Sequence, residues 1–370
     1  MSDVHGYAIP VVSLDSDDGF GVGARAEVYR ARDGYEPYLD AWMVHLHATL
    51  SGYQHHRMRY DRLWPHARLT VNLAYRKWQN AGWYGLGDGW RVLDPPNPKF
   101  QRYILQQPFG RVTVRHDLTG PLQAFVAADL DVTTIKTHPG ESGLLNQAPN
   151  GMDGGPQLEG LAGLIVDTRE PEISPLHGVY AELSGRAGAR LPMIAPRGAM
   201  FGVMAVAKGY EQLTPGVVFA GRIMAERLWG DVPFYEMTHW GGSTPIVGMG
   251  GAETIRGLAS DRFHAPGHAV ANAELRVDFL TLHIRKAPLV AEAVPFADAG
   301  TTWGTDHTAL METCAVCVHP SAGLGLRAVY DASFVGRLDF AIAPDAVRYE
   351  GDLNGVKPTW GFYLAFDHMF

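Results

Sequence analysis

The two cysteines of the chain, Cys314 and Cys317, form a Cys-x-x-Cys motif that His319 follows closely. Such a motif can form a disulfide, bind zinc or carry out redox chemistry. Zinc would need a second pair of ligands at finger-like spacing, and covalent haem needs a histidine directly after the second cysteine. The sequence has neither pattern, so we predict a disulfide between Cys314 and Cys317 and keep zinc or redox chemistry as alternatives.

Two other sets of residues are typical of metal binding or of nucleophilic catalysis. His45 and His47 would share one face of a strand, as metal ligands can, but no third ligand accompanies them. We expect two water-facing histidines there and no metal site. Ser142 lies in a Gly-Glu-Ser-Gly stretch, yet no histidine and aspartate can be assigned to activate it. We therefore predict that the protein is not an enzyme and has no cofactor.

Arg256 is the third candidate, and it lies within the glycine-flanked stretch GGAETIRGLASDRF, residues 250–263. An arginine beside a glycine is common in surface turns. A guanidinium is also a rigid fork of donors that matches carboxylates, and partial burial strengthens such a pair. The choice between a surface turn and an anchored arginine depends on the elements around the motif.

Those elements are strands, because polar and apolar residues alternate along most of the chain. In residues 268–279, even positions are polar and odd positions are apolar, with Val270 as the exception. No helical period competes with this pattern. Sixteen strands are predicted, near residues 7–15, 19–31, 38–51, 53–64, 67–79, 101–117, 121–136, 157–168, 178–187, 198–208, 216–229, 269–280, 289–300, 321–331, 335–344 and 360–370.

The lengths of the connections favour a membrane barrel over a soluble β-sandwich, although alternation alone fits both. From the fifth predicted strand onward, long and short connections alternate, and the longest covers residues 230–268. Long loops at one end and short turns at the other are typical of bacterial outer-membrane barrels. The sequence therefore predicts an all-β fold, a 16-stranded antiparallel transmembrane β-barrel that occupies residues 1–370 as a single domain.

Composition narrows the possible partners. The net charge of −8, without basic clusters, excludes a nucleic-acid-binding face. No apolar run reaches the roughly 18 residues of a transmembrane helix. The first ten residues contain no export signal, so either the protein stays inside the cell or the signal was removed. Nine aromatic residues lie near the extracellular ends of predicted strands, and we expect several of them to belong to an interfacial girdle: Trp78, Trp83, Tyr84, Trp90, Trp229, Phe234, Tyr235, Trp303 and Trp360.

Four motifs, in order along nearly the whole chain, resemble those of the BamA superfamily of outer-membrane barrels, also called the bacterial surface antigen family. They are the Asp-Thr-Arg turn of Asp167 and Arg169, the loop motif Ile255, Arg256, Gly257 and Leu258, the strand motif Phe296, Asp298 and Gly300, and the terminal aromatic Phe370. The resemblance implies a location in the bacterial outer membrane. It also implies that the sixth extracellular loop folds into the barrel lumen.

The resemblance further implies partners for these residues. In the family the loop arginine is held by acidic residues of the following two strands. Strand parity places Glu274 and Asp278 on the lumenal side of the strand 269–280, and Glu292 and Asp298 share one face of the next strand. We therefore expect Arg256 to pair with Glu274, Asp298 or both. Phe370 resembles the signal that barrel-assembly machinery reads, which makes that machinery and the lipid bilayer expected partners.

Two departures from the family pattern bear on function. Sixteen strands use the sequence from about residue 7, which leaves no room for periplasmic polypeptide-transport-associated domains, and Leu258 replaces an aromatic. A separate periplasmic partner or a homo-oligomer is therefore possible. The resemblance implies insertion or translocation of protein or lipid through a weak seam between the first and last strands, where Pro10 should shorten pairing. The alternative is a passive pore or structural barrel.

Overall fold

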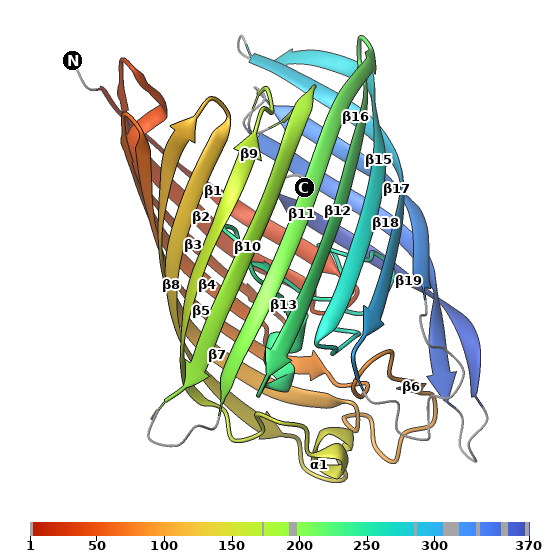
Figure 1. The fold of residues 1–370 in the computed structure, drawn as a ribbon. Coiled ribbons are helices and arrows are strands. Elements are labelled where there is room, and N and C mark those ends of the chain that lie inside the picture. Colours follow the sequence, from red (N-terminus) through yellow and green to blue (C-terminus); the bar gives the residue numbers. More distant parts are fainter. Residues whose placement is uncertain are drawn as a thin grey trace.

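The computed structural model describes residues 3–171, 174–191, 198–284, 287–305, 318–330, 334–348, 354–366 and 370. Its main sheet has 17 strands, of which β6 (Arg91–Val92) has two residues, and it closes because β1 pairs with both β2 and β19. The other sixteen strands form the tilted barrel wall in Figure 1. They are β1 (Asp3–Asp15), β2 (Gly19–Arg32), β3 (Tyr35–Thr49), β4 (Gln54–Trp64), β5 (Ala67–Gly82), β7 (Arg102–Thr119), β8 (Leu122–Thr137), β9 (Gly155–Asp167), β10 (Gly178–Arg190), β11 (Ala199–Thr214), β12 (Val217–Gly230), β15 (Gly267–Ile284), β16 (Ala287–Trp303), β17 (Val318–Tyr330), β18 (Phe334–Arg348) and β19 (Asn354–Phe366).

This architecture confirms the predicted 16-stranded antiparallel barrel. Neighbouring long strands all pair antiparallel, and most boundaries lie within a few residues of those predicted. The largest differences are that β11 continues past residue 208 to Thr214 and that, in the pair of last strands, β18 extends past residue 344 and β19 begins before residue 360. Pro344 and Pro358 lie opposite each other inside this pair. A proline lacks only the amide hydrogen, so it can remain in a strand where that hydrogen has no ladder partner.

The apolar faces of the strands point outward, which excludes a soluble sandwich. On β17, Leu324 and Leu326 are 65% and 50% exposed, whereas Ser321 and Arg327 on the opposite face are buried. A sandwich would bury the apolar face instead. The outer surface of the barrel is therefore suited to lipid and its lumen is polar.

The longest connection, which we call the sixth loop, comprises residues 231–266 between β12 and β15. It contains the 3-10 helix η1 (Phe234–Thr238) and a short hairpin of β13 (His239–Trp240) and β14 (Ile246–Val247). A second long connection, between β8 and β9, contains the helix α1 (Gly143–Gln147). Figure 1 shows α1 and β6 beyond the end of the barrel at which the long loops lie. No helix in the described part of the chain is long and apolar enough to cross a membrane.

The barrel closes through a short seam. β1 pairs with β19 at two positions in the described residues, Leu14 with Leu364 and Asp15 with Tyr363. By contrast, the register of β1 with β2 and that of β18 with β19 each comprise 13 pairs. Within the described residues, most of β1, including Pro10, has ladder partners on β2 alone. The pairing described at this seam is short, as expected from the sequence.

The aromatic residues divide between two environments. Trp229 and Trp360 are exposed on the outer face, as an interfacial girdle requires. Three other aromatic residues of this set are buried in one apolar cluster: Trp83, Phe234 and Tyr235. They pack there with Tyr103, Leu105 and Leu144. These three residues do not belong to a girdle, because the long loops fold inward and supply an interior that sequence parity does not reveal.

Candidate functional site

The sixth loop is held against the barrel wall by Arg256, whose side chain is fully buried. Its Nε and Nη2 donate to the two carboxylate oxygens of Asp298 on β16, both at 2.9 Å. Its Nη1 donates to Glu274 on β15 at 2.9 Å and to Asp339 on β18 at 3.1 Å. The guanidinium also lies 3.3 Å from the ring centroid of Phe296. Arg256 thus contacts both carboxylates expected from the sequence, and Asp339 in addition.

Three arginines and three carboxylates are joined by the shorter ion pairs of this buried site, which we call the arginine–carboxylate cluster: Arg256, Arg276, Arg327, Glu274, Asp298 and Asp339. A fourth buried arginine, Arg337, lies at its edge, with its Nε 3.8 Å from Asp339. Each of these charges has at least one partner of opposite sign, which matters because an unpaired buried charge is strongly destabilising. Burial alone lowers the pKa of Arg256, but Asp298, Glu274 and Asp339 together raise it above its ordinary value. The loop arginine therefore remains charged and paired. Asp278, on the same strand as Glu274, is exposed.

Gly257 allows the loop to approach β18 closely. Its φ is +94°, and a Cβ atom would lie 3.2–3.3 Å from backbone atoms of β18. Its amide donates to the hydroxyl of Tyr363 at 3.0 Å, and the side chain of Thr359 donates to its carbonyl oxygen. The backbone conformation suits glycine, and the close packing leaves no room for a side chain. Gly257 thus joins the loop to β19, one of the two seam strands.

The buried Arg262, which the sequence-based interpretation did not single out, anchors the other end of the motif. It donates to Asp345 of β18 at 2.8 Å and to the backbone carbonyl oxygens of Asp88 and Gly89 at 3.0 and 3.1 Å. The sequence-based interpretation also did not single out Asn272. Its side-chain amide donates hydrogen bonds to the Thr254 carbonyl oxygen and to Asp298. The only signal in the sequence was that Arg262 belongs to the same stretch as Arg256.

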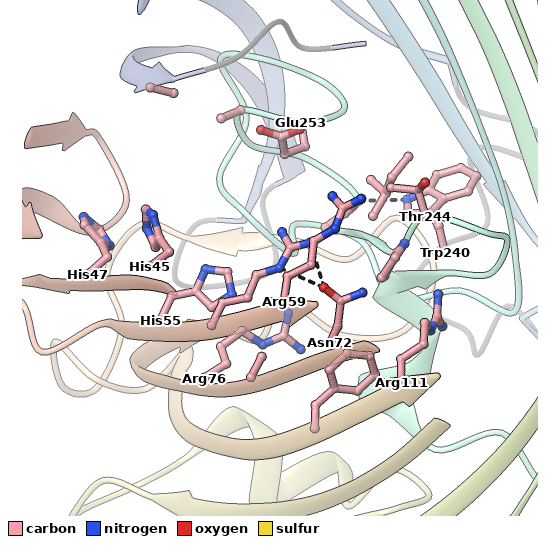
Figure 2. A pocket seen from close by; sticks show the side chains of 18 of the residues that line it. His45, His47, His55, Arg59, Asn72, Arg76, Arg111, Trp240, Thr244 and Glu253 are labelled. Carbon is pink, nitrogen blue, oxygen red and sulfur yellow. Dashed lines mark hydrogen bonds between the residues drawn. The ribbon is translucent and has the colours of Figure 1, made fainter. Parts of the chain in front are cut away.

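Beside the sixth loop lies an open cavity of about 1040 Å³ inside the barrel. Side chains of β1 to β5 line one side of it, and residues of the sixth loop line another. Figure 2 shows His45, His47, His55 and Arg76 on the strands, with Glu253 on the loop above them. The lumen thus has a part closed by the anchored loop and a part that remains open.

The fold is similar to those of three solved structures. BamA from Haemophilus ducreyi lacking POTRA domains 1–3 aligns over 98% of this chain and 70% of its own, with a TM-score of 0.59 and 15% identity. CdiB from Escherichia coli aligns over 96% of this chain and 62% of its own, with a TM-score of 0.61 and 11% identity. CdiB from Acinetobacter baumannii aligns over 98% of this chain and 60% of its own, with a TM-score of 0.54 and 11% identity.

The chain shares its barrel fold with the solved structures of BamA and CdiB. It spans less than two thirds of the length of either CdiB chain. No family model matches the sequence, and no curated protein is similar to it in sequence. The shared feature is therefore the architecture of the barrel.

Of the other motifs that resemble the BamA superfamily, Asp167, the last residue of β9, pairs with Arg169 in the connection to β10. Arg169 Nε and Nη2 donate to the two Asp167 carboxylate oxygens at 2.9 and 2.7 Å. The Arg169 guanidinium lies 4.8 Å from the centroid of the Tyr180 ring. Gly300 faces the sixth loop, since a Cβ atom there would overlap Ile255. Leu258 is buried in the same apolar cluster as Ile255.

Phe370 lies in the lumen and does not continue the last strand, so the predicted strand 360–370 was wrong at its end. β19 ends at Phe366, and the ring of Phe370 packs with Tyr210 and Ala220. Arg222 and Arg276 lie 5.0 and 5.8 Å from its centroid. These cations favour the lumenal position of the ring, since a cation near an aromatic face is attracted to it.

The remaining sequence candidates lie apart from the arginine–carboxylate cluster. Ser142 caps the N-terminus of α1, where its Oγ accepts from the Leu145 amide at 3.4 Å. His45 and His47 line the open cavity with ring centroids 6.2 Å apart, and His47 Nε2 is bonded to Ser13 at 2.7 Å. Cys314 and Cys317 lie outside the described residues.

Proposed function

We propose that this barrel resides in the bacterial outer membrane and assists insertion or translocation of protein or lipid there. The observation that carries this proposal is the two-pair seam between β1 and β19. A strand paired on one side alone presents free amide and carbonyl groups, which are a template for another strand. In lipid such groups are costly, so an incoming strand that pairs with them gains stability.

The similarity in fold to BamA and CdiB supports the same proposal, since both have barrels of this architecture. The anchored sixth loop supports the barrel next to the seam, because the Gly257 amide donates a hydrogen bond to the hydroxyl of Tyr363, a seam residue. In this proposal the seam opens while the arginine–carboxylate cluster keeps β15 to β18, on the β19 side of the seam, fixed.

Locking the seam tests the proposal. Leu14→Cys with Leu364→Cys places a disulfide across β1 and β19, in a background with Cys314→Ser and Cys317→Ser. The matched control, Val12→Cys with Val22→Cys, links β1 to β2 instead. Proteoliposomes that contain the unlocked barrel should accelerate the folding of a client outer-membrane barrel. The seam lock should abolish the acceleration until reductant is added, and the control lock should not.

A passive pore is the second candidate, favoured by the open cavity of about 1040 Å³. It predicts steady conductance in planar bilayers. Conductance without any acceleration of client folding would reject the insertion proposal and support the pore.

A further inference from the structure

The ladder between β17 and β18 stops short at the end of the barrel where the long loops lie. Its last pair is Ala322 with Ile342, although β17 pairs with β16 as far as Val318 and β18 pairs with β19 as far as Arg348. Within the described residues, positions 318–321 of β17 and 343–348 of β18 therefore have no register with each other. We call these two unpaired strand ends the arms of a fork in the barrel wall.

Two prolines explain where this ladder stops. If the register continued by two residues beyond Ala322 and Ile342, Pro320 would lie opposite Pro344. A proline has no amide hydrogen to donate, so neither strand can supply a ladder bond from this position. The sequence itself therefore keeps β17 and β18 from pairing along their full length.

A segment from another part of the wall covers the β18 arm of the fork. Residues 86–93, which we call the strap, belong to the connection between β5 and β7 and contain β6. In Figure 1, β6 lies on the β18 and β19 side of the barrel, away from β5 and β7. It pairs in parallel with Val347 and Arg348, and the Leu93 amide donates to the Arg348 carbonyl oxygen at 3.0 Å. The strap thus occupies the strand edge that β17 leaves, and a covered edge cannot pair with other chains.

The strap also contacts the β17 arm, through the buried Asp88. One carboxylate oxygen of Asp88 accepts from the Thr302 hydroxyl of β16 at 2.7 Å and lies 2.8 Å from Nε2 of His319 on β17. The ring of Phe263, from the sixth loop, lies 4.2 Å from the ring of His319. The strap therefore spans the fork, with Asp88 on one arm and β6 on the other.

The attachment of the strap is short and its backbone can change direction. Two ladder pairs hold it to β18, whereas nine pairs join β17 to β18 below the fork. Gly87 and Gly89, on either side of Asp88, have φ values of +70° and +43°. Glycine reaches both positive and negative φ readily, so the backbone around Asp88 can rearrange at low cost. Segments held by few contacts are the ones that open locally in a folded protein.

We propose that the strap is a releasable bolt across the fork. While Asp88 holds Thr302 and His319 and β6 pairs with β18, the two arms stay together. When the strap leaves, the facing prolines prevent the arms from pairing with each other, so the arms part and the lumen opens laterally to lipid. This opening lies between β17 and β18 and is separate from the seam of β1 and β19, so it stands or falls independently of the insertion proposal.

Two spin labels on the outer face of the arms test the bolt in lipid nanodiscs. Val318→Cys and Ala346→Cys carry the labels, in a background with Cys314→Ser and Cys317→Ser. Dipolar broadening of the EPR spectrum reports that the labels are close, and we expect it in the parent barrel. Asp88→Ala should remove the broadening from part of the molecules, because the strap then loses its contacts with the β17 arm. Asp94→Ala is the matched control, since it removes an exposed carboxylate of the same connection and should leave the spectrum unchanged.

A second pair of labels, on Ala299→Cys and Val318→Cys, locates the change. These positions lie on β16 and β17, whose ladder continues past the fork, so their broadening should persist in Asp88→Ala. Thr302→Val keeps the shape of the side chain but removes one bond to Asp88, and should have a smaller effect on the first pair. Different mobility of unheated and boiled samples on a gel verifies that each variant is folded. Unchanged broadening of the first pair in Asp88→Ala, an equal loss in Asp94→Ala, or a loss in the second pair would overturn the proposal.

Discussion

Arg256 and Asp298 form a two-pronged ion pair inside the barrel, with both guanidinium–carboxylate distances at 2.9 Å. The Arg256 amide also donates to the same carboxylate at 3.1 Å, so side chain and backbone of the sixth loop are held by one residue of β16. This double attachment fixes both the position and the direction of the loop.

Removing the arginine should release the loop. Arg256→Ala leaves Asp298, Glu274 and Asp339 buried with one cation fewer, a change that costs about 3–5 kcal/mol in comparable buried pairs. We expect faster limited proteolysis within residues 230–268. Glu274→Gln should have a smaller effect in the same direction, because Asp298 still holds the arginine. Unchanged cleavage in both variants would show that the loop is anchored by other contacts.

Gly257→Ala should unseat the loop without altering any charge. The positive φ disfavours alanine by about 1–3 kcal/mol, and its Cβ would press on the backbone of β18. Hydrogen exchange of the backbone amide of residue 257, which donates to the Tyr363 hydroxyl in the native protein, should become faster. Gly209→Ala is the control, since a Cβ there meets nothing within 4 Å and φ is not positive. Equal exchange in the two variants would contradict the close-packing argument.

The attachment of the sixth loop to the β1–β2 turn should weaken as pH rises. Asp17 accepts from the Ser260 amide at 3.0 Å and hydroxyl at 2.9 Å. Burial raises the pKa of Asp17 to about 6 and that of Asp18 to about 7, above the value of 3.8 for a free side chain. The native state therefore binds more protons than the unfolded state between about pH 4 and 7, and stability falls through that window.

Hydrogen exchange at Ser260, corrected for the intrinsic rate, measures this effect. Protection should be lower at pH 8 than at pH 5. Asp17→Asn removes one titrating group, so protection at Ser260 should change less with pH in this variant. If protection depends on pH as steeply as in the unmodified protein, other groups cause the effect.

Phe370→Ala should free the C-terminus from the lumen. The ring lies near two cations, and each such contact contributes about 0.5–2 kcal/mol. Faster digestion by carboxypeptidase is expected. Phe362→Ala, which shortens an aromatic side chain on the outward face of β19, is the control. Equal digestion rates in both variants would argue against the lumenal contact. The role of Phe370 as an assembly signal is a separate prediction that folding assays with assembly machinery would measure.

Much of the barrel could be predicted because its environment is simple. A wall between lipid and water requires alternation at every second residue, so β17 reveals its two faces through Leu324, Leu326 and Arg327 without knowledge of any neighbour. The same parity placed Glu274 and Asp298 on the lumenal face, where Arg256 reaches them.

The tertiary structure decided which lumenal groups meet. Asp339 lies 83 residues from Arg256 in the chain, and their contact exists because β18 stands close to β15 and β16 in the closed barrel. Arg262 and Phe370 likewise take positions set by long-range partners, Asp345 in one case and Arg222 in the other. Periodicity reports the environment of a side chain, which is local to its strand. Pairing across a lumen depends on closure, register and loop path, which only the folded chain defines.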